Sequence, residues 1–161
     1  MGAGKTTIGK LLADELDLEF IDVDREIESR SGVDIPWIFD KEGEAGFRLR
    51  ETAALRELGT QDRVLISTGG GAVMAAENRD LMSATGIVIY LHTSVEEQVR
   101  RTSRDRKRPL LQNDDPGAVL ARLMAVREPL YRDVAAIVVD TDGRGPKVVA
   151  QDLADRLRRL P

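Results

Sequence analysis

The chain has 161 residues, with 24 Lys and Arg, 28 Asp and Glu and a net charge of −4. This length favours one domain with an ordinary hydrophobic core, and the mildly acidic balance argues against a broad nucleic-acid-binding surface. The absence of cysteine and the single histidine, His92, exclude disulfides, a cysteine nucleophile and a zinc site built from several histidines. The chain has no apolar run of the roughly 20 residues that cross a bilayer and no visible signal peptide, so we expect a soluble cytoplasmic protein.

Hydrophobic periodicity predicts helices that alternate with short strands along the chain. Strands are expected at residues 18–23, 63–67, 87–91 and 136–140. Helices are expected around residues 8–16, 24–30, 37–41, 44–58, 76–84, 94–101, 117–127 and 149–160. This alternation is typical of a single α/β domain whose parallel sheet is covered by helices on both faces.

Two connections carry additional signals. Ser94, followed three residues later by Glu97, fits a capping box at the start of a helix. Residues 103–116 are polar, basic and without periodicity. They fit a mobile lid better than a domain boundary, because the helix and strand that follow are needed to complete the sheet.

The segment Gly2-Ala3-Gly4-Lys5-Thr6-Thr7 opens directly onto the first helix and predicts a phosphate-binding loop. In such a loop, glycines let backbone N–H groups surround phosphates, the Lys reaches the β- and γ-phosphates and the next hydroxyl binds Mg²⁺. The first Gly of the full pattern and the strand that feeds the loop would precede Met1. We therefore expect either a native chain that begins earlier or a gap in the middle of the sheet. A glycine-rich tail before a helix is the alternative interpretation.

Asp22 and Asp24 are candidates for the chemistry of phosphoryl transfer. In a strand, residues i and i+2 face the same side, so both carboxylates are expected to face the phosphate loop. Asp22 is suited to a place near a metal, and Asp24 to orienting or deprotonating a hydroxyl. The alternative is that the two residues cap the next helix.

Two arginines fit a small anionic acceptor, because a guanidinium pairs bidentately with a carboxylate. They are Arg48 and Arg127. The alternative for Arg48 is a surface ion pair with Glu44 or Glu51.

Other features have two interpretations each. The glycines at 69–71 indicate close backbone approach or a flexible turn, and Arg101 contacts a ligand or pairs with Glu97. The basic run at 100–108 is a solvated face or a nucleic-acid patch, and the acidic total disfavours the latter. We expect His92 to be structural and Trp37 to lie in the core or partly against a substrate.

Several motifs occur in a specific order along the whole chain. They are Gly4-Lys5-Thr6, Asp22-Val23-Asp24, Phe47-Arg48 with Glu51, Thr68-Gly69-Gly70-Gly71, Arg108-Pro109-Leu110-Leu111 and Arg127-Glu128-Pro129-Leu130-Tyr131, the last of these placed after a helix. Together they resemble shikimate kinase, a small P-loop kinase similar in fold to the nucleoside monophosphate kinases. The resemblance implies an α/β P-loop three-layer sandwich with a parallel sheet, here without its first, central strand, and a mobile lid. It also implies a single domain over 1–161, with a substrate-binding subdomain at about 24–60 and the lid at about 103–116.

The resemblance also implies site residues. The expected ATP contacts are Gly2, Ala3, Gly4, Lys5, Thr6, Thr7, Arg101, Arg108, Arg144 and Pro146. The expected shikimate contacts are Asp24, Arg48, Gly69, Gly70, Gly71 and Arg127. Thr6 is expected to bind Mg²⁺ directly and Asp22 through water, and the expected catalytic residues are Lys5, Asp24 and Arg108.

The implied activity is the ATP-dependent phosphorylation of the 3-hydroxyl of shikimate, in aromatic amino-acid biosynthesis. The expected partners are shikimate and ATP, for a monomer that binds neither nucleic acid nor membranes. Two alternatives are a related small-metabolite kinase of the gluconate kinase type and a non-catalytic anion-binding relative.

Overall fold

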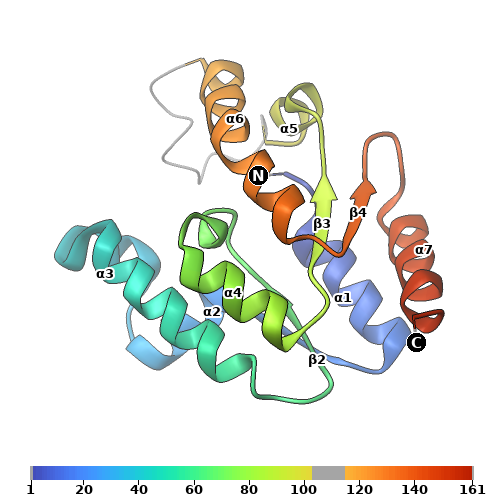
Figure 1. Cartoon of the computed structure of the whole chain (residues 1–161). Coiled ribbons are helices and arrows are strands. Elements are labelled where there is room, and N and C mark those ends of the chain that lie inside the picture. The colour runs from blue at the N-terminus through green and yellow to red at the C-terminus, as the bar shows by residue number, and fades with distance from the viewer. Residues whose placement is uncertain (1, 103–114, 161) are drawn as a thin grey trace.

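The computed structural model describes residues 2–102 and 115–160, and Figure 1 shows helices around short strands. The helices are α1 (Lys5–Leu16), α2 (Val23–Ser31), α3 (Ile35–Leu58), the 3₁₀ turn η1 (Ala72–Met74), α4 (Ala76–Thr85), α5 (Val95–Thr102), α6 (Pro116–Val134) and α7 (Pro146–Arg158). The strands are β1 (Glu19–Asp22), β2 (Val64–Ser67), β3 (Ile89–His92) and β4 (Ile137–Asp140). Within this described part, no helix is both long and apolar enough to span a membrane.

The strands pair in parallel, as their alternation with helices predicts. β1 pairs with β2, with Asp22 opposite Ser67 at the carboxyl ends, and β3 pairs with β4, with His92 opposite Asp140. Among the described residues the two pairs form separate sheets. The arrows of β3 and β4 in Figure 1 run toward the end of the molecule where the N-terminus lies.

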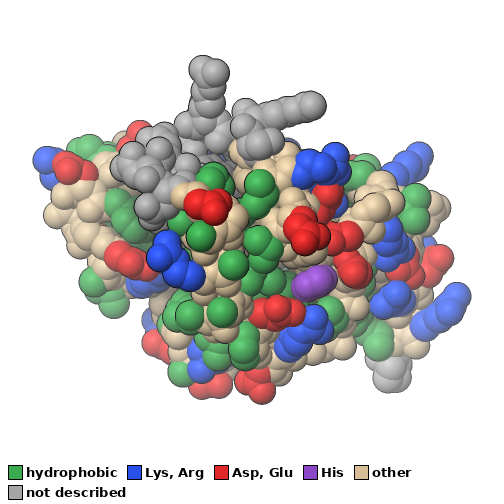
Figure 2. Space-filling view, turned by 90° about the horizontal axis from the view of Figure 1, so that it is seen from above, with side chains coloured by type: hydrophobic (Ala, Val, Ile, Leu, Met, Phe, Trp, Pro, Cys, Tyr) green, Lys and Arg blue, Asp and Glu red, His purple; other side chains and the backbone are tan. Residues whose placement is uncertain are grey.

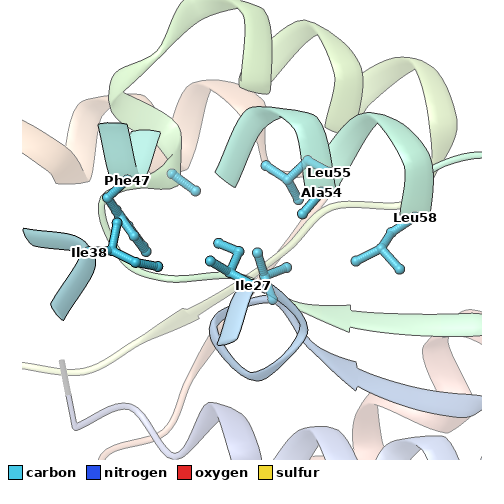
Figure 3. Close-up of a cluster of buried hydrophobic side chains, with 8 residues drawn as sticks. Ile27, Ile38, Phe47, Ala54, Leu55 and Leu58 are labelled. Carbon is cyan, nitrogen blue, oxygen red and sulfur yellow. The ribbon is translucent and has the colours of Figure 1, made fainter. Parts of the chain in front are cut away.

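Two clusters of buried apolar side chains hold the helices in place. One cluster, drawn in Figure 3, joins α2, α3 and the segment after β2; it consists of Val23, Ile27, Ile38, Phe47, Ala54, Leu55, Leu58 and Ala72. The other packs α1 and α7 against β4; it consists of Ile8, Leu12, Val139, Val149, Ala150, Leu153 and Ala154. Most of the first cluster falls within residues 24–60, the range predicted for a substrate-binding subdomain.

Helix α3 contains the break that the sequence predicts near Gly43. This residue has φ 72° and ψ −178° inside the helix, and a positive φ favours glycine because other residues have a Cβ that clashes. The helices predicted at 37–41 and 44–58 are the two parts of α3.

Helix α6 is longer than predicted, because it continues past residue 127 to Val134 with Pro129 inside it. Proline lacks an N–H group and usually ends a helix or lies in its first turn. Here the last turns are held by tertiary contacts, since Tyr131 stacks on Tyr90 of β3 and its hydroxyl bonds the carbonyl of Gly70. The prediction that the motif from Arg127 to Tyr131 follows the helix is therefore wrong, because the motif lies within it.

Candidate active site

The segments that carry the predicted site residues meet at the carboxyl ends of the strands. Asp22 ends β1, the glycines at 69–71 follow β2, and residues 141–146 follow β4. In open α/β sheets, ligands bind beyond this edge. The site is therefore assembled from segments far apart in the sequence.

The loop before α1 has the geometry of a phosphate cradle. Gly2 and Gly4 have φ of 70° and 83°, which glycine adopts without a steric penalty. Gly4 is the N-cap of α1, and no side chain caps this helix. The N–H groups of its first turn and the positive end of its dipole are therefore available to an anion.

A pocket of about 470 Å³ opens beside this loop, a size typical of small-molecule sites. Its lining comes from the loop, α1, α5 and the segment after β4; it comprises Ala3, Gly4, Thr7, Ile8, Glu97, Arg100, Arg101, Thr141, Gly143, Arg144, Gly145 and Pro146. Six residues predicted to contact ATP are in this set: Ala3, Gly4, Thr7, Arg101, Arg144 and Pro146. Gly2, Lys5 and Thr6 are outside the lining, and Arg108, with the predicted lid up to residue 114, lies outside the described residues.

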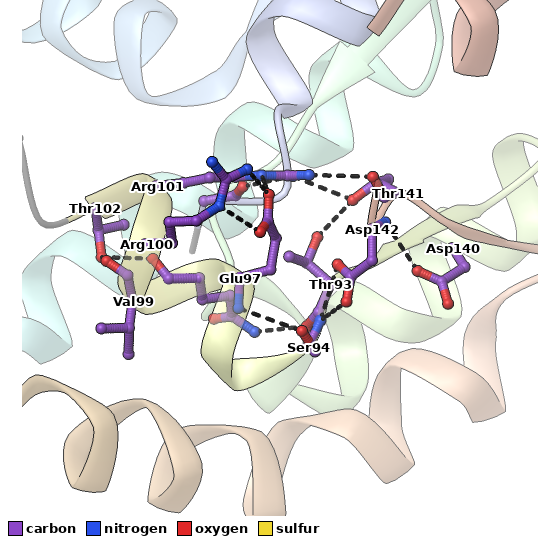
Figure 4. A network of polar contacts seen from close by, with 12 residues as sticks. Thr93, Ser94, Glu97, Val99, Arg100, Arg101, Thr102, Asp140, Thr141 and Asp142 are labelled. Carbon is purple, nitrogen blue, oxygen red and sulfur yellow. Dashed lines mark hydrogen bonds and ion pairs between the residues drawn. The ribbon is translucent and has the colours of Figure 1, made fainter. Parts of the chain in front are cut away.

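Arg101 connects the pocket wall to the phosphate loop, as Figure 4 shows in part. Its guanidinium donates to the carbonyl of Gly2 at 3.0 Å, to the carbonyl of Thr141 at 3.0 Å and to Glu97 Oε1 at 2.6 Å. The Arg101 side chain is only 25% exposed. The pair with Glu97 is thus one contact in a partly buried network that a planar guanidinium suits.

Of the two hydrogen bonds of the capping box predicted at α5, the structure contains the one accepted by Ser94 and not the one accepted by Glu97. Ser94 Oγ accepts from the N–H of Glu97 at 3.2 Å, but the N–H of Ser94 donates to the carboxylate of Asp142 at 3.1 and 3.2 Å. Glu97 instead accepts hydrogen bonds from Arg100 and Arg101, which lower its pKa to about 2. Asp142, 48 residues away, therefore takes the place predicted for Glu97.

Asp22 and Asp24 do not share a strand, contrary to the prediction. β1 ends at Asp22 and α2 begins at Val23, because Asp22 caps that helix. Its Oδ1 accepts from the N–H groups of Asp24 at 3.0 Å and Arg25 at 3.3 Å. The alternative that the sequence left open is thus correct for Asp22, and Asp24 lies in the first turn of α2.

Asp24 nevertheless lies near the phosphate loop. Burial raises its pKa and the charge of Asp22 raises it further, while the charges of Lys5 and Arg48 oppose this rise. Its buried Oδ1 has no hydrogen-bond partner among the described residues. Glu51 is similar, because it is fully buried, its Oε1 has no such partner and burial raises its pKa despite the hydrogen bond from Arg48.

The glycines at 69–71 are in close contact with these polar side chains. A Cβ added at Gly69 would lie 3.3 Å from Glu51 Oε1 and 3.5 Å from Asp24 Oδ1. A Cβ at Gly71 would lie 2.8 Å from the guanidinium carbon of Arg48. Glycine thus gives the Arg48 guanidinium its place beside the backbone.

Gly70 contacts the second predicted arginine. A Cβ there would lie 3.5 Å from Nη1 of Arg127 and 3.1 Å from the hydroxyl of Tyr131. The structure therefore brings Arg48 and Arg127, from α3 and α6, to neighbouring glycines of one loop.

Polar residues of this region that are absent from the predicted site include Arg100, which lines the pocket, and four others. Thr141 and Glu97 line the pocket, Glu51 pairs with Arg48 at 2.7 Å and Tyr131 bonds Gly70. The sequence contains a signal for Glu51, which lies three residues after Arg48, and for Tyr131, which lies four residues after Arg127. Thr141 has no local signal, since its hydroxyl bonds that of Thr93 across 48 residues.

His92, the last residue of β3, lies between two acidic side chains. Its imidazole nitrogens lie 3.8 Å from Glu128 and 3.7 Å from Asp140, and Figure 2 shows the purple histidine among red acidic groups. On this face the described basic and acidic side chains are interspersed. The structural role expected of His92 stays a prediction.

Comparisons with known proteins agree with the geometry. A model of the shikimate kinase family matches residues 1–158. The shikimate kinase of Pseudomonas aeruginosa (strain LESB58) is 60% identical over 161 residues, which cover all of this chain and 94% of that relative. The chain belongs to the shikimate kinase family.

Solved structures of the shikimate kinase family share the fold of this chain. The enzyme from Acinetobacter baumannii, solved in complex with shikimate, has a TM-score of 0.93 at 47% identity, covering 100% of this chain and 91% of that one. The enzyme from Aquifex aeolicus has a TM-score of 0.82 at 33% identity, covering 98% and 91%. The P-loop α/β fold and the kinase activity expected from the motifs are thereby confirmed.

Proposed function

We propose that this shikimate kinase transfers the γ-phosphoryl group of ATP to the 3-hydroxyl of shikimate, giving shikimate 3-phosphate and ADP. The observation that carries the proposal is the position of the phosphate loop. Ala3 and Gly4 line the nucleotide-sized pocket, and the charge of the adjacent Lys5 acts on Asp24. A donor in the pocket would thus have its phosphates close to the proposed acceptor side, and the shikimate-bound A. baumannii relative supports the acceptor.

The acceptor would bind against the glycines at 69–71, where Arg48 and Arg127 offer cations to its carboxylate. Guanidinium groups bind carboxylates through paired, charge-assisted hydrogen bonds. Arg48 is already oriented by Glu51 at 2.7 Å and by Glu44 at 3.2 Å. This preorganisation reduces the entropy that binding has to remove.

Asp24 is the proposed acceptor of the hydroxyl proton. Its unpartnered Oδ1 can receive a hydrogen bond, and a raised pKa makes its carboxylate a stronger base than an ordinary aspartate. As the shikimate oxygen bonds the γ-phosphorus, the bond to the ADP oxygen breaks and the proton passes to Asp24. Lys5 would neutralise charge on the phosphates, which is the main demand of phosphoryl transfer.

The residues at the loop fit Mg²⁺ held through phosphates and water. The described residues contain no group of three acidic, His or Cys side chains that could hold a metal ion, but Mg²⁺ commonly uses one or two carboxylates, substrate phosphates and several waters. The hydroxyl of Thr6, an exposed residue, would hold it directly and the carboxylate of Asp22 through water. Bound there, the ion would neutralise phosphate charge.

The remaining expectations belong to the same proposal. We propose a monomer in the cytoplasm that needs neither nucleic acid nor a membrane, with a substrate-binding subdomain at 24–60 and Arg108 of the lid contacting phosphates. The separate apolar cluster of α2 and α3 supports the subdomain.

A coupled ADP-release assay with an acceptor panel tests the proposal. We expect release that requires both shikimate and Mg²⁺, and a phosphorus–proton coupling in the product NMR spectrum that places the phosphate on the 3-oxygen. Turnover of gluconate but not of shikimate would replace this proposal with a gluconate kinase activity. Failure to bind ATP and to turn over any acceptor would favour a non-catalytic relative.

A further inference from the structure

The hydroxyl of Tyr131 links the glycine loop to α6. It donates to the carbonyl oxygen of Gly70 at 2.5 Å. Tyr131 lies four residues after Arg127 within α6, a spacing that places two side chains on the same helix face. The Arg127 guanidinium lies at the same glycine, because a Cβ at Gly70 would be 3.1 Å from the Tyr131 hydroxyl and 3.5 Å from Arg127 Nη1. The hydroxyl thus binds a glycine of the proposed shikimate site at the place where its arginine also lies.

The ring of Tyr131 is fixed independently of its hydroxyl. It stacks on Tyr90 of β3, with ring centroids 4.9 Å apart and an interplanar angle of 27°. Burial raises the pKa of the Tyr131 phenol, although the charge of Arg127 partly opposes this. The phenol therefore remains protonated at neutral pH and keeps its donor for Gly70.

Tyr90 offers an internal comparison. It lies in the same stack, burial raises its pKa to about 12, and its buried hydroxyl has no hydrogen-bond partner among the described residues. Two stacked tyrosines thus differ in the use of their hydroxyls: only that of Tyr131 contacts the site.

We propose that Tyr131 is a positioning residue for the acceptor side of the reaction, because its hydroxyl fixes the Gly70 peptide and the Arg127 guanidinium where the shikimate carboxylate binds. This inference rests on the proposed function, which assigns Arg127 and the glycine loop to shikimate. Without the hydroxyl, the Gly70 carbonyl loses its donor and the Arg127 guanidinium loses a polar neighbour at Gly70. The loss should affect shikimate binding and leave the nucleotide side, built from α5 and the segment after β4, unchanged.

The test compares Y131F with Y90F, since each variant removes one hydroxyl from the same stack. With both substrates varied, we expect Y131F to raise the shikimate KM about tenfold, equal to about 1.4 kcal/mol, with the ATP KM and kcat changed less than about twofold. Y90F should leave all three constants unchanged. Equal effects of the two variants, or an unchanged shikimate KM in Y131F, would overturn the proposal.

A double-mutant cycle with R127K separates positioning from general loss of stability. If Tyr131 acts through Arg127, adding Y131F to R127K should raise the shikimate KM by much less than tenfold, because coupled residues are not additive. Full additivity, or a drop in Y131F melting temperature with both KM values raised, would reduce Tyr131 to a structural residue. A wild-type enzyme that ignores shikimate would instead overturn the proposed function, before either variant is compared.

Discussion

The guanidinium of Arg48 occupies the position where a side chain at Gly71 would begin, so only glycine fits at residue 71. A Cβ at Gly71 would lie 2.8 Å from the guanidinium carbon of Arg48, whose Nη1 donates to the buried carboxylate of Glu51 at 2.7 Å. The φ of Gly71 is −90°, which any residue adopts. Sterics at Arg48, rather than backbone strain, therefore explain the need for glycine.

G71A should impair shikimate binding without unfolding the protein. The added methyl group must push away the guanidinium, which is the far end of a flexible side chain, so the melting temperature should change little. Losing a charge-assisted contact typically costs about 1.5–3 kcal/mol, which predicts a rise of about tenfold or more in the shikimate KM. G86A is the matched control, because nothing lies within 4 Å of a Cβ there. A G71A enzyme with normal KM would show that Arg48 does not hold the acceptor.

D24N should separate catalysis from stability. If Asp24 accepts the hydroxyl proton, kcat should fall about 10²–10⁴-fold while the ATP KM is nearly kept. Burial is the main reason that the pKa of Asp24 is raised, and the charge of Asp22 adds to it. The folded state therefore binds the proton of the Asp24 carboxyl more tightly than the unfolded state does. The protonated Asp24 carboxyl therefore adds to the free energy of unfolding at low pH, and this contribution is lost as the pH rises through the folded-state pKa.

The same substitution therefore has a predicted effect on unfolding. At neutral pH the ionised Asp24 disfavours folding, so D24N should leave the melting temperature unchanged or raise it, and any gain should shrink as the pH is lowered. Thermal unfolding at several pH values measures this. Equal losses of ATP affinity and turnover, or a lower melting temperature at neutral pH, would contradict the role and the environment assigned to Asp24.

The raised pKa of Asp24 also predicts the pH dependence of the reaction. Activity that needs the ionised carboxylate should fall, as the pH is lowered, at a higher pH than for an ordinary aspartate. Because the charge of Asp22 contributes to this rise, D22N should move the acid limb of kcat/KM to lower pH, whatever it does to the maximal rate. D34N removes one charge from another helix cap, that of α3, and should leave the limb in place. An unmoved limb in D22N would assign the titration to another group.

Local patterns in the sequence were sufficient to predict most of the fold. Alternating apolar runs and helix faces predict the order of the elements, and Gly43 and Ser94 mark a break and a cap that the structure contains. The error at Asp24 arose because the spacing of two acids fits both a strand and a helix cap. What decides between them is the burial of Val23 in the core of α2 and α3, which is a tertiary effect.

Partners far apart in the sequence could not be predicted from spacing. Arg101 bonds the carbonyl of Gly2, 99 residues earlier, and Tyr131 bonds that of Gly70 across 61 residues. Both acceptors are backbone atoms, which every residue has, so no residue type signals them. Likewise, α6 continues through Pro129 only because its end packs on another element.

R101K tests whether the Arg101 network serves the nucleotide. Lysine keeps the charge, but its single ammonium cannot reproduce the fork that joins Glu97, Gly2 and Thr141 at 2.6–3.0 Å. We expect the ATP KM to rise about tenfold while the shikimate KM stays near the wild-type value, because the acceptor side contacts α3 and α6 instead. R56K, at the exposed pair of Arg56 with Glu77, should change neither constant. If R101K lowered the melting temperature and left the ATP KM unchanged, Arg101 would be a structural link between α5 and the phosphate loop, and the alternative of an ion pair with Glu97 would be the better account of it.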